Sequence, residues 1–113
     1  MHEMSLAENV REIVDETARG NGARRVTRVR LEIGRLAQIE PQAMRFAFDV
    51  VKRGSLADGA RLEIIEVDGS AWCLGCSQPA VIAQRVQACP HCGSYQLQVN
   101  GGDRMRVMDI EIE

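Results

Sequence analysis

Apolar residues recur at helical spacing in two stretches of the chain. In the first stretch, Ser5 can cap a helix together with Glu8 three residues later, and Gly20 marks its end. The second stretch starts at Pro41, a residue that suits the first turn of a helix, and ends before Gly54. We expect the buried faces of these two helices to consist of Leu6, Val10, Ile13 and Val14, and of Ala43, Met44, Ala47, Phe48, Val50 and Val51.

Strand-like patterns, in which apolar and polar residues alternate or β-branched residues cluster, fill three further stretches. These stretches are residues 26–33, 62–67 and 106–113. Four cysteines lie between the last two, in a segment bounded by Gly69-Ser70 and by Gly101-Gly102-Asp103. Within this segment, residues 80–85 and 95–99 can form two more short strands.

Composition sets only broad limits on the function. The formal net charge of −2 over 113 residues gives no global attraction to nucleic acid or to anionic lipid. No apolar run approaches the roughly 18 residues that a membrane span needs, and Met1 to Ser5 lacks the pattern of a secretory signal. We therefore expect a cytoplasmic protein without a membrane or nucleic-acid partner. In that reducing compartment, cysteines serve as metal ligands rather than as disulfides.

The cysteines form two pairs, Cys73-x₂-Cys76 and Cys89-x₂-Cys92, separated by twelve residues. A two-residue spacer lets a tight turn direct both thiolates at one ion, and two such turns complete a tetrahedron around Zn²⁺. Four thiolates fill the coordination sphere, which predicts a structural zinc ion rather than a catalytic one. An iron–sulfur cluster is the alternative, and a redox-active pair would leave the other pair unexplained. His91, inside the second pair, is either an exposed spacer or a substitute ligand.

The order of these elements predicts an α+β fold. We expect a small α/β body, with two helices on a three-stranded sheet, and an inserted zinc-ribbon module. The body would comprise residues 1–69 and 103–113, and the zinc ribbon residues 70–102. Trp72, directly before the first cysteine pair, is expected to pack over the zinc module.

The first three residues form a second candidate metal site. The amine of Met1, together with the backbone nitrogen and the imidazole of His2, can close chelate rings on one ion, and Glu3 can add its nitrogen or its carboxylate. Deprotonated amides favour Ni(II) or Cu(II) over zinc. Taken alone, this pattern is weak, because a histidine at position 2 is usually part of an untethered tail with no metal-binding role.

Together, the N-terminus and the cysteine pairs resemble one family, the hydrogenase nickel-incorporation proteins of the HypA/HybF type. The similarity covers nearly the whole chain. It is carried by Met-His-Glu-Met-Ser-Leu-Ala at the start, Val-Arg-Leu-Glu-Ile-Gly at 29–34, residues 41–48, the first cysteine pair, and Cys-Pro-His-Cys-Gly-Ser at 89–94. The resemblance implies a nickel metallochaperone for [NiFe]-hydrogenase maturation, with Ni²⁺ as cargo at Met1, His2 and Glu3 and Zn²⁺ in the four-cysteine site.

The resemblance also implies further partners and one further site residue. The partners are a nickel-handling GTPase and the large-subunit precursor of the hydrogenase. Glu40 matches a position where the family often has an acidic residue near the nickel site, although the helix dipole also favours a carboxylate there. Which hydrogenase is served, any role in urease maturation, and whether the protein is a monomer or a homodimer stay open.

Two other functions are compatible with a zinc ribbon. An adaptor for nucleic acid or for the transcription or translation machinery predicts basic residues on the ribbon, yet residues 73–99 contain Arg85 as their only fixed positive charge. The densest basic cluster lies elsewhere, at Arg24, Arg25, Arg28 and Arg30. A purely structural zinc protein predicts that the first three residues can be altered without loss. The sequence shows no phosphate-binding loop and no nucleophile–base motif, so we predict a binding protein rather than an enzyme.

Overall fold

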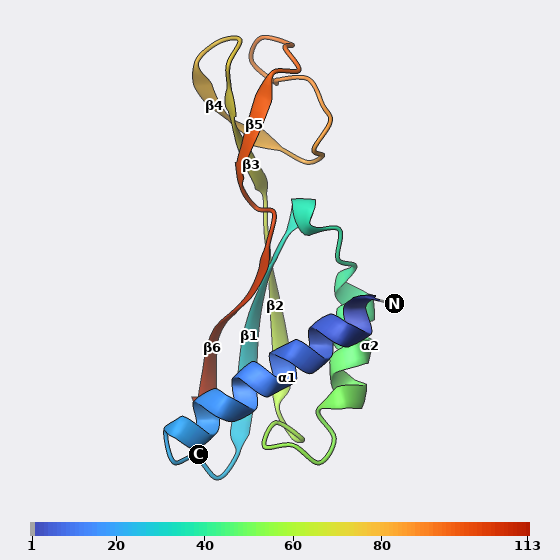
Figure 1. Ribbon diagram of the computed structural model, residues 1–113, viewed down its shortest axis with the longest axis vertical. Coiled ribbons are helices and arrows are strands. Elements are labelled where there is room, and N and C mark those ends of the chain that lie inside the picture. Colours follow the sequence, from blue (N-terminus) through green and yellow to red (C-terminus); the bar gives the residue numbers. More distant parts are fainter. Residues whose placement is uncertain (1) are drawn as a thin grey trace. The chain divides into compact units, whose positions relative to one another are not determined.

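The computed structural model describes residues 2–113 and confirms an α+β fold in which a cysteine module is inserted (Figure 1). The described residues form two α-helices, one short 3₁₀ helix and two three-stranded sheets, with the strand orders β2-β1-β6 and β4-β3-β5. Neither α-helix is long and apolar enough to cross a membrane. The elements in chain order are α1 (His2–Gly20), β1 (Val26–Gly34), the 3₁₀ helix (Arg35–Ala37), α2 (Pro41–Val51), β2 (Arg61–Val67), β3 (Gly69–Cys73), β4 (Gln78–Ile82), β5 (Leu97–Gly101) and β6 (Met105–Ile112).

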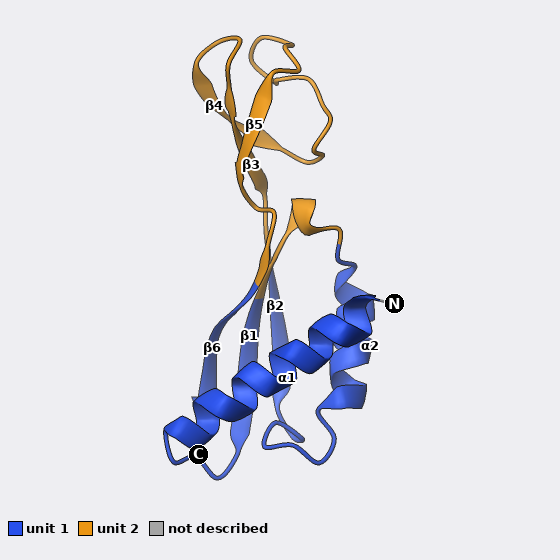
Figure 2. Cartoon of the chain, in the orientation of Figure 1, with its two compact units in different colours: residues 1–31, 39–65, 106–113 blue, residues 32–38, 66–105 orange. Residues whose placement is uncertain are grey.

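The chain divides into two compact units, coloured separately in Figure 2. The first unit contains the chain up to Leu31, Ile39–Ile65 and Arg106–Glu113. The second unit contains Glu32–Gln38 and Glu66–Met105, and therefore holds all four cysteines. It also includes the 3₁₀ helix, which the sequence analysis placed in the body.

The first unit is built around the buried faces of α1 and α2, which contact each other, and around β1. Two of the expected core positions are wrong, because Ile13 is 48% exposed and Val50 is 37% exposed. In α1, the small residues Ala7 and Ala18 are buried as well, although neither was among the expected core positions. The buried apolar residues of the two helices are Ala7, Val10, Val14 and Ala18 in α1, and Met44, Ala47 and Phe48 in α2.

The arginines of β1 form ion pairs with both neighbouring strands. Arg28 contacts Glu63 at 2.9 Å and Glu111 at 2.7 Å, because β1 lies between β2 and β6. Arg30 donates from its Nε to Asp109 at 2.9 Å, and this contact holds the pKa of the Asp109 carboxyl below its usual value. The basic cluster that raised the question of RNA binding is therefore largely neutralised by carboxylates of the same unit.

The second unit packs its core around the cysteines. Strand β3 pairs antiparallel with both β4 and β5, so that Cys73 lies opposite Gln78 on one side and Leu97 on the other. The side chain of Leu36, from the 3₁₀ helix, joins this core, which explains why residues 32–38 belong to the second unit. The buried members of the core are Leu36, Ala71, Cys73, Ala80, Ile82 and Cys89.

Glycines bring the two ends of the cysteine module into backbone contact. A Cβ atom on Gly34 would lie 2.2 Å from the carbonyl carbon of Gly102, and one on Gly102 would lie 2.2 Å from the carbonyl oxygen of Asp68. The N–H of Leu36 donates to the carbonyl of Gly102 at 2.8 Å. Gly34 and Gly102 thus permit close approach of three chain segments.

Candidate metal centre

The two cysteine pairs fold into equivalent turns. In the first turn, the N–H of Ser77 donates to the carbonyl of Cys73, and in the second the N–H of Gly93 donates to that of Cys89, both at 2.9 Å. Ser77 and Gly93 also share a left-handed backbone, with φ of 54° and 77°. The same local geometry at both pairs directs the cysteine side chains of each turn to one side.

The four sulfur atoms have the spacing of a tetrahedral metal site. The sulfurs of Cys73 and Cys92 lie 3.6 Å apart and those of Cys76 and Cys89 lie 3.8 Å apart, while all four lie within 4.8 Å of one another. A tetrahedron with Zn–S bonds of about 2.3 Å has S–S edges of about 3.8 Å. A disulfide needs an S–S distance of about 2.05 Å, and all four cysteines are free. The cluster therefore fits a metal ion and not a pair of disulfides.

The electrostatics of the cluster favour a bound cation. Burial raises the pKa of the Cys76 thiol to about 12, and the neighbouring thiols add to this effect. Burial also opposes ionisation of Cys89, but the N–H groups of His91 and Cys92 lower its pKa to about 6. One sulfur thus ionises readily whereas its neighbour resists, because thiolates this close repel one another. A divalent ion at the centre removes that repulsion and lets all four bind as thiolates.

Trp72, beside the cluster, differs from the sequence expectation, whereas His91 does not. His91 is exposed, and its backbone N–H points to the sulfur of Cys89 at 3.4 Å. Trp72 was expected to cover the module, but it is 40% exposed because alternation along β3 places it on the opposite face from Cys73. Leu36 is in the core instead. The sequence analysis missed it because a three-residue 3₁₀ helix leaves no periodic signal.

The predicted nickel residues are only partly brought together. Met1 lies outside the described residues, and α1 already begins at His2 instead of at Ser5. The His2 side chain is 59% exposed, with its Nε2 3.9 Å from the Glu3 carboxylate. The backbone N–H groups of Glu3 itself and of Glu40 lower the pKa of the Glu3 carboxyl, against the opposing effect of burial. Glu3 therefore lies beside the loop that precedes α2.

The carboxylate of Glu40 serves a structural purpose. It accepts a hydrogen bond from the N–H of Ala43 at 2.7 Å and thereby caps the start of α2. Over residues 2–113, the four cysteines are the only group in which three or more histidine, cysteine or acidic side chains gather their ligand atoms. His2, Glu3 and Glu40 do not form such a group.

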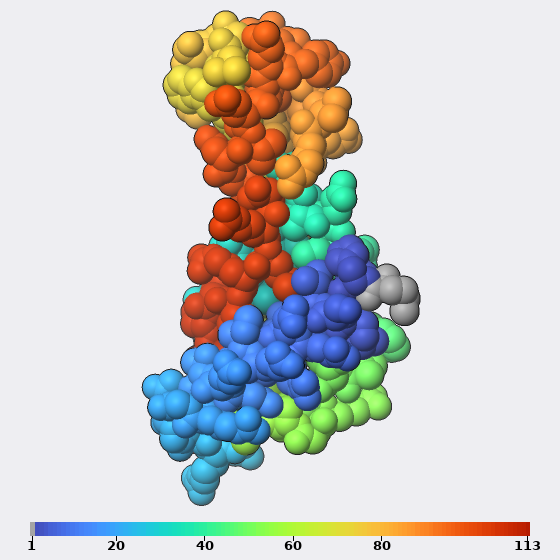
Figure 3. Space-filling view, viewed as in Figure 1, coloured from blue at the N-terminus to red at the C-terminus, as the bar shows by residue number. Residues whose placement is uncertain are grey.

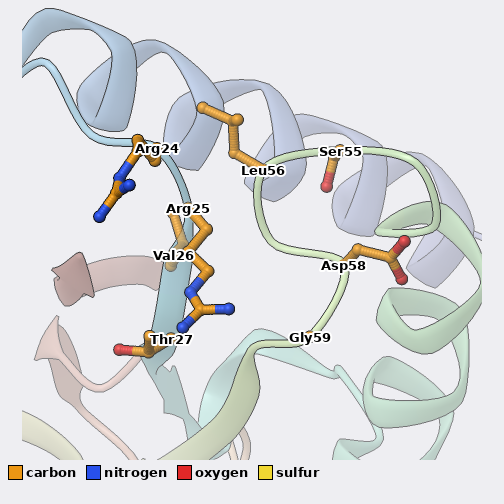
Figure 4. Close-up of a pocket in the computed structure, with 8 residues that line it drawn as sticks. All are labelled: Arg24, Arg25, Val26, Thr27, Ser55, Leu56, Asp58 and Gly59. Atoms are coloured by element: carbon orange, nitrogen blue, oxygen red, sulfur yellow. The ribbon is translucent and has the colours of Figure 1, made fainter. Parts of the chain in front are cut away.

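A separate hollow of about 270 Å³ lies at the start of β1, between this strand and the 55–59 turn (Figure 4). The guanidinium of Arg25 in its wall pairs with the side chain of Glu113. The hydroxyl of Ser55 donates to the carbonyl of Lys52 at 2.6 Å, and Asp58 accepts the N–H of Gly54 at 3.2 Å. Because Ser55 and Asp58 bond to backbone groups instead of to each other, this hollow offers no nucleophile–base pair.

Comparison with known proteins decides between the open functions. A family model described as "Hydrogenase/urease nickel incorporation, metallochaperone, hypA" matches residues 1–112. The chain belongs to the HypA family. Membership confirms the resemblance and, with it, the predicted function of a nickel metallochaperone in hydrogenase maturation. The four-cysteine site of this HypA chain is consistent with the zinc that the sequence analysis predicted.

HypA proteins of several bacteria are similar to the chain over its whole length. The hydrogenase maturation factor HypA of Azotobacter chroococcum mcd 1 is 54% identical over 113 residues, and that of Alkalilimnicola ehrlichii is 55% identical over 113 residues. Both alignments cover 100% of each chain. The solution structure of the nickel metallochaperone HypA from Helicobacter pylori superimposes with a TM-score of 0.72 at 25% identity, covering 97% of this chain and 96% of that one. The HypA fold is thus shared across these sequences.

Proposed function

We propose that this HypA protein carries Ni(II) at its N-terminus while the four cysteines hold a structural zinc ion. The nickel ligands are the amine of Met1, the imidazole of His2, and Glu3, with Glu40 close by. In this proposal, residues 1–69 with 103–113 form the nickel-binding body, and residues 70–102 form the zinc ribbon. The match to a nickel-incorporation family over residues 1–112 carries the proposal.

The start of α1 supports a nickel site that holds its ion loosely. The first four N–H groups of a helix have no partner within the helix, so their nitrogens can bind a metal without breaking a helical hydrogen bond. The positive end of the helix dipole lies there as well and disfavours a cation. The exposed side chain of His2 leaves the site open to a recipient. These features suit a carrier that must release its cargo.

Glu3 and Glu40 support the site in different ways. The Glu3 carboxylate, held by two backbone N–H groups, fixes the first turn of α1 next to residue 40. The Glu40 carboxylate is bound to the start of α2 by the 2.7 Å hydrogen bond from Ala43. Glu40 therefore supports the proposed site by holding the start of α2 in place, and its carboxylate can bind nickel only if its hydrogen bond with Ala43 breaks.

Zinc gives the second unit a covalent-like crosslink between its two cysteine turns. Cys73, Cys76, Cys89 and Cys92 would hold it, and sulfur separations of 3.6 and 3.8 Å support a four-sulfur site. The left-handed positions at Ser77 and Gly93 support turns that the protein's own residues fix, and four free cysteines support a metal site rather than disulfides. Four sulfur ligands leave no position for a substrate, which supports a binding protein rather than an enzyme.

Delivery of nickel requires partner proteins with activities that this chain does not itself provide. We propose a cytoplasmic nickel-handling GTPase, since the sequence contains no phosphate-binding loop, and the large-subunit precursor of a [NiFe] hydrogenase. Pairing of Arg25, Arg28 and Arg30 with carboxylates gives the nucleic-acid adaptor no support.

The first test is a calorimetric titration of nickel into untagged, zinc-loaded protein. We expect about one nickel per chain with micromolar affinity or tighter. The His2→Ala variant and a form extended by residues before Met1 should both lose this binding, because each removes one ligand of the chelate. Affinity should also fall in mild acid, since free imidazole has a pKa of about 6.5 and binds metals in its neutral form. Equal binding by all three proteins would refute the N-terminal site.

A further inference from the structure

The two cysteine turns of the second unit lie in close contact with each other. A Cβ atom on Gly75, in the first turn, would lie 3.4 Å from the sulfur of Cys92, in the second. The N–H of Leu74 donates to the carbonyl of Gln96 at 2.9 Å, and β3, which leads into the first turn, pairs with β5, which follows the second. The sulfurs of one turn therefore face those of the other at close range.

The four sulfur atoms pair off between the turns. Cys73 in the first turn lies 3.6 Å from Cys92 in the second, and Cys76 lies 3.8 Å from Cys89. Each sulfur thus has a partner in the other turn, and none is left over. Because a disulfide bond is about 2.05 Å long, each of these pairs has to close by less than about 2 Å to form one.

One sulfur of each pair is more accessible than its partner. Cys92 is exposed and Cys76 is half-buried, whereas Cys73 and Cys89 are buried. In Figure 3, atoms of the two cysteine segments, yellow for the first and orange for the second, lie at the surface of the second unit. A small oxidant in solution reacts first with an accessible thiolate. The buried member of the pair is then in position to complete a disulfide.

We propose that the four cysteines form a reversible redox switch, in which hydrogen peroxide converts them into the disulfides Cys73–Cys92 and Cys76–Cys89. The accessible thiolate of each pair attacks one peroxide oxygen, breaks the O–O bond and becomes a sulfenic acid, while hydroxide leaves. The buried thiolate then attacks that sulfur, forms the S–S bond and displaces a second hydroxide. Each disulfide therefore gives two electrons to one peroxide, which takes up two protons and ends as two water molecules.

Oxidation exchanges one crosslink of the second unit for another. Disulfide sulfurs are no longer thiolates, the form that binds metal, so the oxidised site releases its zinc. Disulfides between the turns join residues 19 and 13 positions apart and keep the turns connected, whereas a disulfide within a turn would join residues only three apart. The oxidised second unit is therefore expected to stay folded and to bind zinc again after reduction. This inference rests on the zinc site of the proposed function and does not involve the nickel ligands.

The position of Arg85 makes the pairing measurable. It is the only trypsin cleavage site between residues 62 and 103 and lies between the two cysteine pairs. Trypsin therefore produces the peptides 62–85 and 86–104, each with one complete pair. Disulfides between the turns join these two peptides, whereas disulfides within the turns leave them separate.

The test treats full-length, zinc-loaded protein with hydrogen peroxide, blocks the remaining thiols and analyses the unreduced tryptic digest by mass spectrometry. We expect the two peptides to be joined by two disulfides, and about one zinc per chain to be released to a chromogenic indicator. Chymotrypsin cleavage after Leu74 and fragmentation before Pro90 separate the two cysteines of each peptide, and should identify the pairs as Cys73–Cys92 and Cys76–Cys89. Reduction by a phosphine in the presence of zinc sulfate should restore about one zinc per chain.

Four outcomes would overturn the switch. The first is a pair of separate peptides, each with an internal disulfide, and the second is the other pairing between the turns. The third is a predominance of sulfinic or sulfonic acids, which would show that no second thiolate is in reach. The fourth is retention of zinc by the oxidised chain. Zinc content before treatment is measured separately, and a value near zero would refute the zinc site of the proposed function instead.

Amide hydrogen exchange provides the matched control. Protein stripped of zinc by a chelator under reducing conditions has neither crosslink, and it should lose protection in β3 and β5. The oxidised protein also lacks zinc but should keep protection in both strands, because its disulfides join the turns. Equal loss of protection in the two samples would show that the disulfides do not replace the metal crosslink.

Discussion

At the scale of single residues, the space around a backbone position can decide which residue is tolerated there, as two glycines of the chain illustrate. Gly102 adopts φ of +70° and has the carbonyl oxygen of Asp68 where a Cβ would be. Gly59 has nothing within 4 Å of that position. In the sequence, both residues are glycines between elements, and nothing local shows that only Gly102 is indispensable. The atom that leaves no room for a Cβ on Gly102 belongs to Asp68, which lies 34 positions earlier in the chain.

Gly102→Ala is therefore expected to destabilise the protein severely. The added methyl group must displace a backbone carbonyl at 2.2 Å and hold a left-handed φ, so the free energy of unfolding should fall by more than about 3 kcal/mol. Urea unfolding followed by circular dichroism measures this. Gly59→Ala serves as the control and should change stability by less than about 1 kcal/mol. A similar loss of unfolding free energy in the two variants would show that the two ends of the cysteine module, at Asp68 and Gly102, are not tightly packed.

At the scale of elements, local periodicity predicted the long helices and strands. It did not predict short elements or contacts between distant segments of the chain. Both α-helices and the three strands of the first sheet lie close to their predicted ranges. Strand β3 was missed, because its sequence, Gly69–Cys73, ends in three consecutive apolar residues and so shows no alternation of apolar and polar positions. The start of α1 was placed at Ser5 from its capping signal, whereas the helix begins at His2, and Glu3 in its first turn contacts residue 40. Such a contact between distant segments leaves no local pattern.

The cap on α2 leads to a prediction that separates stability from nickel binding. Glu40→Ala should lower the free energy of unfolding by about 1 kcal/mol, because the N–H of Ala43 loses its acceptor. Glu40→Gln keeps an acceptor oxygen and should lose less than half of that amount. Urea unfolding of both variants, beside nickel titration, makes the comparison. A nickel affinity at least tenfold weaker in Glu40→Gln, with unchanged stability, would instead make Glu40 a direct ligand.

At the scale of the whole molecule, the sequence predicted the cysteine site better than the N-terminal one for a physical reason. A two-residue spacer fixes the positions of the two thiolates of each pair relative to one another. The sequence prediction then needs only one further assumption, that the two turns meet. At the N-terminus, Glu3 contacts residue 40, which lies far along the chain beyond α1, and no spacing rule describes such a contact. Leu36 joins the cysteine core from outside the inserted segment, and this contact likewise leaves no signal in the sequence.

Removal of zinc is expected to unfold the second unit and to leave the first one folded. The buried core of the second unit has only six members, two of which are the proposed metal ligands Cys73 and Cys89, so metal binding and the folding of this unit are coupled. The helices belong to the first unit and have their own core. Hydrogen exchange after treatment with a strong chelator should show lost protection in β3, β4 and β5 and retained protection in α1 and α2. Uniform loss across the chain would show that the two units unfold as one.

The contact between Asp68 and Gly102 has a consequence for how such a protein can change over evolutionary time. The segment between them leaves and rejoins the chain at almost the same point, since a methyl group does not fit between the two residues. An inserted segment whose two ends lie side by side can be lengthened, shortened or exchanged without changing the path of the rest of the chain. Selection can therefore alter residues 69–101 while the rest of the chain keeps its own sequence constraints. The cysteine module can in this sense be exchanged as one segment, and a chimera that carries the module of a distant relative would show whether the rest of the chain tolerates the exchange.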